Sequence, residues 1–182
     1  MKYIVFDLEM NNKWGTSIHE IIEIGAVKIN QDLVIEDDFQ AFVRPKTHTV
    51  LSRLIKKKTR IRQEWVDRAP LLPVVLERFR DWIGPDEFLL CGWSSDDHLA
   101  LQRNYKMNGL AEPEYDLLNN YRDIQKCFIN LFQQKNQVSL KNALEMLNIT
   151  PKYDIWHRAI YDAFHTAQVF VEIYDKIDFD RG

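Results

Sequence analysis

The sequence begins with a short apolar run, Tyr3 to Phe6, that leads directly into Asp7-Leu8-Glu9. Tyr, Ile, Val and Phe favour a buried, pleated setting, so this segment is predicted to be a core strand. The side chains of a strand alternate between its two faces, and Asp7 and Glu9 therefore project from the same face. Any fold of this chain has to accommodate two carboxylates side by side at the end of its first strand.

Two carboxylates on one face repel each other unless a cation lies between them or one of them keeps a proton. Hard divalent cations such as Mg²⁺ and Mn²⁺ prefer oxygen ligands and would relieve the repulsion between Asp7 and Glu9. The alternative is that the strand simply ends here and both carboxylates are hydrated. The Asp-x-Glu pattern is compatible with both interpretations, and residues later in the chain have to distinguish them.

The length and composition favour a single globular domain, residues 1–182. Of the 182 residues, 46% are hydrophobic and 28% are charged, as in ordinary globular proteins. No apolar stretch reaches membrane-spanning length, and too few apolar residues precede Asp7 for a signal peptide, so we expect a cytoplasmic protein without a membrane partner. Cys91 and Cys127 have no partner at metal-ligand spacing and are expected to be buried free thiols.

The formal net charge of −3 argues against non-specific coating of a nucleic-acid backbone, which normally requires a basic surface. It is compatible with an enzyme that binds only the end of a strand. Six cations are nevertheless concentrated in one run: Arg53, Lys56, Lys57, Lys58, Arg60 and Arg62. This run either holds phosphates or forms the solvated face of a helix.

Three strands are predicted in the first quarter of the chain. The polar segment from Met10 to Glu20 is interpreted as a loop, in which Trp14 either stacks on a base or covers the edge of the core. Residues 21–29 and 39–43 are rich in apolar, β-branched and aromatic residues, and turn residues separate them. Short connections between successive strands predict an antiparallel meander.

The later part of the chain alternates helices and strands. Apolar residues recur at helical spacing from Ala69 to Gly84, and a buried strand is predicted from Phe88 to Trp93. The segment from Tyr115 to Tyr121 is considered as a further short strand. A helix between two strands implies a crossover connection and parallel pairing. The expected fold is therefore α/β, with a mixed central β-sheet, an antiparallel meander plus parallel strands, flanked by α-helices.

Three polar residues are expected at the ends of these elements. Asp97 lies near the start of a helix that opens at Ser94, where it could complete a capping box, reach the ligand-binding edge of the sheet, or do both. His157 and Asp162 would lie roughly 140° apart on one helix. They can act together only if His157 lies in the loop or first turn before the helix that carries Asp162.

The order Asp7, Glu9, Asp97, His157, Asp162 resembles that of the DEDDh 3′-to-5′ exonucleases of the ribonuclease H-like superfamily. The wider context is similar as well, in the segments Glu20-Ile21-Ile22-Glu23-Ile24-Gly25-Ala26-Val27, Phe42-Val43-Arg44-Pro45, and His157-Arg158-Ala159 with Asp162-Ala163. The segments Val43-Arg44-Pro45 and Leu51-Ser52 look most like the branch that holds the histone-mRNA exonucleases and the bacterial KapD-like sporulation-inhibitor proteins. This resemblance covers nearly the whole chain.

The resemblance implies a ribonuclease H-like fold and two divalent metal ions, Mg²⁺ or Mn²⁺. It assigns Asp7, Glu9 and Asp162 to one ion, and Asp7, with Asp97 acting largely through water, to the other. Two ions suit phosphodiester hydrolysis because they can clamp the scissile phosphate from both sides. His157, whose ordinary pKa is near neutrality, would take the proton from the attacking water.

Two segments depart from the family pattern. Asp96 stands where relatives commonly have an aromatic residue, so Asp96 is an alternative ligand to Asp97, although the spacing to Leu101 favours Asp97. The segment Leu-Thr-Gly-Ile of relatives is Lys58-Thr59-Arg60-Ile61 here, with Arg60 in place of the glycine. Relatives contact the substrate through this segment, and Arg60 changes the segment in this chain.

The sequence thus predicts a metal-dependent 3′-to-5′ exonuclease that hydrolyses single-stranded nucleic acid, RNA rather than DNA by resemblance, to 5′-mononucleotides. Met10, which relatives use to contact the terminal nucleotide, and Trp14 are the expected substrate-binding residues. The alternative is a non-catalytic module on the same fold that binds nucleic acid or a protein. A dinucleotide-binding Rossmann domain is disfavoured because no Gly-rich turn follows the first strand.

Overall fold

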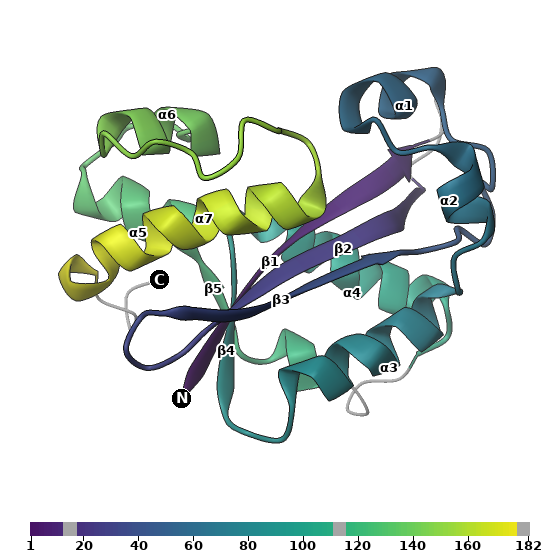
Figure 1. The fold of residues 1–182 in the computed structure, drawn as a ribbon, viewed down its shortest axis with the longest axis horizontal. Helices are drawn as coiled ribbons and strands as arrows, with labels where there is room; N and C mark the ends of the chain where they lie inside the picture. The colour runs from purple at the N-terminus through teal and green to yellow at the C-terminus, as the bar shows by residue number, and fades with distance from the viewer. Residues whose placement is uncertain (13–17, 111–115, 178–182) are drawn as a thin grey trace.

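One mixed sheet separates two layers of helices (Figure 1). The computed structural model describes residues 1–12, 18–110 and 116–177, and Trp14 lies outside the described residues. The strand order in the sheet is β3-β2-β1-β4-β5. The first strand of the chain therefore occupies the centre of the sheet.

The strands pair as the pattern of short and long connections predicts. β1 (Lys2–Asn12), β2 (His19–Ile29) and β3 (Ile35–Phe42) form an antiparallel meander. β4 (Phe88–Gly92) pairs parallel to β1, and β5 (Tyr121–Asp123) pairs parallel to β4. The predicted mixed sheet is confirmed.

The helices divide between the two faces of this sheet. They are α1 (Arg53–Thr59), α2 (Gln63–Asp67), α3 (Leu72–Ile83), α4 (Ser95–Met107), α5 (Ile124–Leu131), α6 (Leu140–Met146) and α7 (Ala159–Ile173), with 3-10 turns at Asp116–Leu118 and Tyr174–Lys176. In Figure 1, α5, α6 and α7 lie on one side of the sheet, and α3 and α4 on the other. The short helices α1 and α2 lie beyond the ends of β1 and β2.

β1 contributes to two hydrophobic cores because its side chains alternate. Tyr3 and Val5 are buried in the core beneath α7, whereas Ile4, Phe6 and Leu8 are buried against α3 and α4. The regular pairing with β2 continues as far as Glu9, where a bulge follows. Asp7 and Glu9 therefore continue the series of Tyr3 and Val5 and project toward the face that carries α7.

The predicted loop from Met10 to Glu20 is shorter than expected, because β1 continues to Asn12 and β2 begins at His19. Asn11 is buried, and its side chain donates hydrogen bonds to the carbonyl oxygens of His48 and Val50. Buried Glu20 accepts hydrogen bonds from the backbone N–H groups of residues 46–48. The polarity of these residues suggested a loop. Their hydrogen-bond partners lie far away in the sequence, so the local sequence does not show that these side chains are bonded within the fold.

Two other expected boundaries also shift. The helix predicted from Ala69 begins only at Leu72, where Pro73 occupies the first turn. The strand considered from Tyr115 to Tyr121 is instead a 3-10 turn at Asp116–Leu118 followed by β5, with Tyr115 outside the described residues. Cys91 and Cys127 are buried free thiols, as predicted. Within the described ranges, no helix is both long and apolar enough to cross a membrane.

Helix α7 lies unusually close to the sheet at Gly25. A Cβ atom on Gly25 would lie 2.1 Å from the backbone nitrogen of Ile160 and 2.2 Å from the carbonyl carbon of Ala159. Gly25 pairs with Asp7 across the β1–β2 ladder. The absence of a side chain at this position therefore allows the first turn of α7 to lie directly over the carboxylate-bearing part of β1.

Candidate active site

The central strand β1 loses its parallel neighbour just before the acidic residues. Pairing between β1 and β4 ends at Val5 and Cys91, whereas pairing with β2 continues through Asp7 and Glu9. On the side of β4, the backbone of β1 is consequently open beyond Val5. The site lies at this opening, beyond the carboxyl end of the paired part of β4, where ligands commonly bind in α/β sheets.

Asp97 reaches this opening from the first turn of α4. The backbone N–H of Leu8, a group that the ended β4 cannot bind, faces its carboxylate and lowers the pKa of Asp97. The neighbouring Asp96 is exposed. The Ser94 hydroxyl caps α4 by accepting from the N–H of Asp96. Asp97 thus faces β1, and Asp96 faces solvent.

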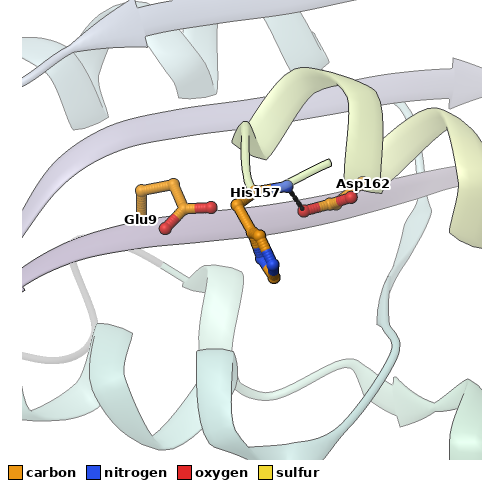
Figure 2. Close-up of side chains that lie close together, drawn as sticks. All are labelled: Glu9, His157 and Asp162. Carbon is orange, nitrogen blue, oxygen red and sulfur yellow. Dashed lines mark hydrogen bonds between the residues drawn. The ribbon is translucent and has the colours of Figure 1, made fainter. Parts of the chain in front are cut away.

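His157 and Asp162 come to the same place from the start of α7. His157 precedes the helix, as predicted, and has a left-handed backbone conformation with a φ of 60°. Its N–H donates a hydrogen bond of 2.9 Å to Oδ2 of Asp162. This contact closes the turn at the start of α7. Figure 2 shows the His157 side chain between Glu9 on β1 and Asp162 on α7.

Three of the five predicted residues form a close group. Glu9, His157 and Asp162 each offer a ligand atom, and these atoms lie within 4.8 Å of one another. Asp7 and Asp97 are not part of that group. They are coupled to it electrostatically, because the carboxylates of Asp97, Asp162 and Glu9 all raise the pKa of Asp7.

The carboxyl groups at this site retain protons at unusually high pH. Burial, and then the neighbouring acids, raise the pKa of Asp7 well above its usual range. Burial is also the main reason that the pKa of Glu9 rises to about 8 and that of Asp97 to about 7. In an isolated protein this arrangement is unfavourable, and a bound cation would relieve it.

The donor atoms present fit a hard divalent cation. Asp162 uses Oδ2 for the His157 N–H, while its buried Oδ1 accepts no hydrogen bond from the described residues. Glu9 is only 7% exposed. Buried carboxylate oxygens without donors are rare unless an ion or water binds them. Carboxylate-rich sites of this kind suit Mg²⁺ or Mn²⁺ better than soft, thiol-seeking metals.

A buried ion pair fixes the segment that carries His157, and the sequence analysis did not anticipate it. Glu23 on β2 is fully buried and accepts hydrogen bonds from Nε and Nη2 of Arg158, at 3.0 and 2.9 Å, and from the N–H of Ala159. The Arg158 guanidinium also lies over the rings of Phe42 and Trp65. In the sequence, the one sign of this contact is the charged residue Glu23 within the apolar segment 21–29.

A second histidine, also absent from the predicted set, lies beside Asp162. His165 is fully buried, and its Nδ1 is 3.5 Å from Oδ1 of Asp162. Its Nε2 lies 2.9 Å from the carbonyl oxygen of Tyr153 and therefore carries the proton that this acceptor needs. The spacing of three residues on one helix places both side chains on neighbouring positions. His165 thus lines the far side of the Asp162 carboxylate.

Comparison with known proteins explains the arrangement. The sequence profile of the RNase_T exonuclease family matches residues 4–170. The chain belongs to this exonuclease family. Among solved structures, the nuclease domain of 3′hExo, a DEDDh family member bound to rAMP, superimposes with a TM-score of 0.87 at 28% identity, over 98% of this chain and 94% of that one. The predicted DEDDh resemblance and the ribonuclease H-like fold are confirmed.

Curated relatives of the family are mostly longer proteins. The chain is 33% identical to human 3′-5′ exoribonuclease 1 over 141 residues, which cover 72% of this chain and 40% of the human protein. It is 29% identical to DNA polymerase III PolC-type of Caldanaerobacter subterraneus subsp. tengcongensis, over 97% of this chain but only 12% of the polymerase. The chain thus spans a minor part of these relatives.

Proposed function

We propose that this protein is a metal-dependent exonuclease that removes 5′-mononucleotides from the 3′ end of single-stranded nucleic acid. The observation that carries the proposal is the convergence of Glu9, His157 and Asp162, from two distant parts of the chain, at the open end of β1. Membership of the exonuclease family supports hydrolysis rather than a purely binding role. We assign the whole activity to one domain, residues 1–182.

RNA is the substrate we favour over DNA. The human relative is named as an exoribonuclease, and a solved relative at 27% identity is a 3′-exonuclease that recognises the 3′ end of a histone mRNA stem-loop. Both are similar to this chain over most of its length. The polymerase relatives argue for DNA, but the chain matches only 12% of the first of them.

The carboxylates are assigned to two divalent ions, Mg²⁺ or Mn²⁺. Asp7, Glu9 and Asp162 would hold one ion, and Asp7 with Asp97 would hold the other. Such ions supply a positive field that clamps the scissile phosphate and stabilises charge on the attacking and leaving oxygens. The protein keeps these carboxylate oxygens buried and in position. The N–H of Leu8 faces the carboxylate of Asp97, and the N–H of His157 donates to the carboxylate of Asp162.

His157 is proposed as the general base. Burial and the positive charge of Lys58 lower the pKa of His157 below 6.5, with Asp162 acting in the opposite direction. The imidazole is therefore neutral near pH 7 and can accept the proton of the attacking water. Its exposed position before α7 leaves the ring accessible to a bound substrate.

Met10 and Trp14 are proposed to contact the terminal nucleotide. Met10 directly follows Glu9 at the β-bulge and is partly buried against the core beneath α3 and α4. Its backbone therefore lies beside the carboxylates, as a contact to a nucleotide at this site requires. Trp14 follows in the same connection, outside the described residues.

The proposal is tested with a 5′-labelled single-stranded oligonucleotide, as RNA and as DNA, in the presence of Mn²⁺. We expect progressive shortening from the 3′ end with release of 5′-mononucleotides, and complete loss in Asp7→Ala. His157→Ala should bind Mn²⁺ but turn over about 10²- to 10⁴-fold more slowly. Tight binding of the oligonucleotide by the wild-type protein without any cleavage would instead support the non-catalytic alternative.

Breaking the ion pair that fixes the His157 segment should reduce turnover through His157. We expect Arg158→Met to lower kcat about 10- to 100-fold, the range observed when groups that orient a ligand are removed. In the His157→Ala background the same substitution should cost less than about twofold, because the residue that it positions is gone. Steady-state kinetics of the two single variants and the double variant measure this coupling.

Two further variants control for a general loss of structure. Arg158→Lys keeps the charge beside Glu23 but not the paired hydrogen bonds, and it should retain more activity than Arg158→Met. Arg78 is an exposed arginine on α3, away from Glu23 and from the carboxylates, so Arg78→Met should leave kcat unchanged. If Arg158→Met slows the wild type and His157→Ala by equal factors, its effect does not pass through His157.

Asp97, not Asp96, is expected to serve the site. Asp97→Asn should lower kcat at least about 10²-fold, because its carboxylate faces β1 and shares the electrostatic field of Asp7. Asp96→Asn, which changes an exposed carboxylate one residue away, should remain within about twofold of wild type. Parallel kinetics at saturating Mn²⁺ distinguish the two, and the reverse ranking would assign the role to Asp96.

Metal affinity should rise with pH through the range 6–8. In the metal-free protein Glu9 and Asp97 are protonated below about pH 8 and about pH 7, and an ion must displace these protons. The apparent affinity for Mn²⁺ should therefore increase by roughly tenfold per pH unit for each proton displaced. Calorimetric titration should show more protons released per bound ion at about pH 6 than at about pH 8, whereas equal affinities at the two pH values would contradict these assignments.

The same groups affect stability in the absence of metal. Their pKa values are higher in the folded than in the unfolded chain, so their contribution is fully present below about pH 4.5 and is lost as pH rises through 7–8. The free energy of unfolding of the metal-free protein should therefore fall as the pH rises from about 4.5 to about 8. Addition of Mn²⁺ at pH 8 should restore it, because the ion binds only the folded state.

A further inference from the structure

The basic run that the sequence analysis left open forms one end of the molecule beside the site. Its members are Arg53, Lys56, Lys57, Lys58, Arg60 and Arg62, here called the α1 basic surface. All six are exposed. Within the described ranges, Arg62 alone among them has a carboxylate within 4 Å, Glu64 at 3.7 Å. The other five cations form no ion pair of that length with a described residue.

Helix α1 is held firmly next to the end of β1. Asn11, two residues beyond Glu9, accepts a hydrogen bond from the N–H of Ser52, which caps α1. At the other end, the buried Thr59 hydroxyl donates to the carbonyl oxygen of Ile55 and accepts from the N–H of Ile61. The start of α1 is thus bonded to β1 and its end is closed by local hydrogen bonds, so the backbone that carries these cations lies next to the end of β1.

Lys58 is the member of this surface that lies toward the carboxylates. Its ammonium lowers the pKa of Glu9, of Asp97 and of His157. Figure 1 shows α1 above the tip of β1. The surface therefore begins at the site and extends away from it.

We propose that the α1 basic surface binds the phosphates of the substrate strand that precede its terminal nucleotide, with Lys58 nearest to the site. This inference rests on the proposed function. The site itself is lined with carboxylates and repels the backbone of a strand, and the chain as a whole carries a net charge of −3. A group of cations beside the site attracts the strand locally and orients its 3′ end toward Asp7 and Glu9.

Basic residues in the last turn of a helix also stabilise the helix itself. Lys56, Lys57 and Lys58 lie in the last turn of α1, where the helix dipole favours positive charge. That effect requires no ligand and involves all three lysines similarly. Strand binding differs because it should depend on salt, on the length of the strand and on which lysine is removed.

The test measures binding of a fluorescein-labelled, single-stranded oligonucleotide of about ten nucleotides by anisotropy, in RNA and DNA forms. The Asp162→Asn variant with Ca²⁺ serves as the parent, so that no strand is consumed. We expect Lys58→Gln to weaken binding about fivefold, and to reduce the slope of log affinity against log salt by about 0.7. Lys56→Gln with Lys57→Gln should add smaller losses.

Two comparisons make the result specific. Lys141→Gln removes an exposed cation from α6, which lies at the opposite end of the molecule from α1 in Figure 1, and should leave both affinity and slope unchanged. A dinucleotide is too short to reach beyond the site, so its affinity should change less than about twofold in Lys56→Gln/Lys57→Gln. Equal affinities of the parent and all α1 variants for the long strand would overturn the inference.

Failure of this inference can be separated from failure of the proposed function. If the wild-type protein releases mononucleotides with Mn²⁺ but the α1 variants bind strands as the parent does, then only the binding surface is wrong. If the wild-type protein releases none but the α1 variants still bind strands more weakly, then the surface is a nucleic-acid site without hydrolysis. Loss of folding in a variant is detected by its unfolding temperature, and Lys58→Arg should restore binding.

Discussion

Asp162→Asn should reduce the rate of 3′-end hydrolysis at least about 10³-fold. The carboxylate of Asp162 has two separate functions in the structure. Oδ2 accepts the His157 N–H at 2.9 Å, and the buried Oδ1 remains available for a cation. An asparagine can still accept one hydrogen bond, but it supplies no negative charge for an ion. The measurement is the single-turnover rate on a labelled oligonucleotide at saturating Mn²⁺.

The matched control is Asp154→Asn, which alters an exposed carboxylate in the segment just before His157. This variant should retain the wild-type rate within about twofold. The affinity of Asp162→Asn for Mn²⁺ should also fall, whereas its unfolding temperature without metal should not decrease, because one of several repelling carboxylates has been removed. A rate for Asp162→Asn within tenfold of wild type would exclude Asp162 from the catalytic group.

Gly25→Ala should damage both stability and activity. The new Cβ would lie 2.1 Å from the Ile160 nitrogen and 2.2 Å from the Ala159 carbonyl carbon, so the first turn of α7 would have to move away from the sheet. Overpacking of backbone against backbone should lower the free energy of unfolding by about 3 kcal/mol. Because this turn carries Asp162, the displacement should also lower turnover about 10²-fold in the molecules that remain folded.

Gly109→Ala is the control for the general cost of replacing a glycine. Gly109 has a φ of 67°, but nothing lies within 4 Å of its hypothetical Cβ. Its replacement should cost about 1 kcal/mol through backbone strain and leave turnover unchanged. Denaturant unfolding gives the free energy of unfolding of each variant, and kcat is expressed per folded molecule. Together the two measurements distinguish the effect of packing at α7 from that of backbone strain. Equal turnover in the two variants would show that the contact at Gly25 does not position Asp162.

The sequence was sufficient to predict the architecture around β1. Alternation along a strand places Asp7 and Glu9 on one face whatever the rest of the fold, and the helical crossover before β4 requires parallel pairing. The placement of His157 ahead of α7 followed from helical geometry, because no helix could bring it together with Asp162. These inferences depend on local backbone geometry, which nearby residues determine.

Contacts between distant residues could not be predicted in the same way. Glu23 and Arg158 are 135 residues apart, and nothing in either local sequence specifies the partner. Asn11 and Glu20 looked like loop residues for the same reason, since their hydrogen bonds go to the segment 46–52. The choice between Asp96 and Asp97 likewise depends on the end of β4, which leaves the Leu8 N–H without a sheet partner.

The central claim is that the acids at the open end of β1 jointly bind divalent ions for hydrolysis. Calorimetric titration of the wild-type protein with Mn²⁺, in the presence of a 5′-mononucleotide, tests it most directly. We predict two bound ions per chain, and loss of both in Asp7→Asn, which would remove the one carboxylate assigned to both ions. Binding of Mn²⁺ to Asp7→Asn with wild-type stoichiometry and affinity would contradict the account.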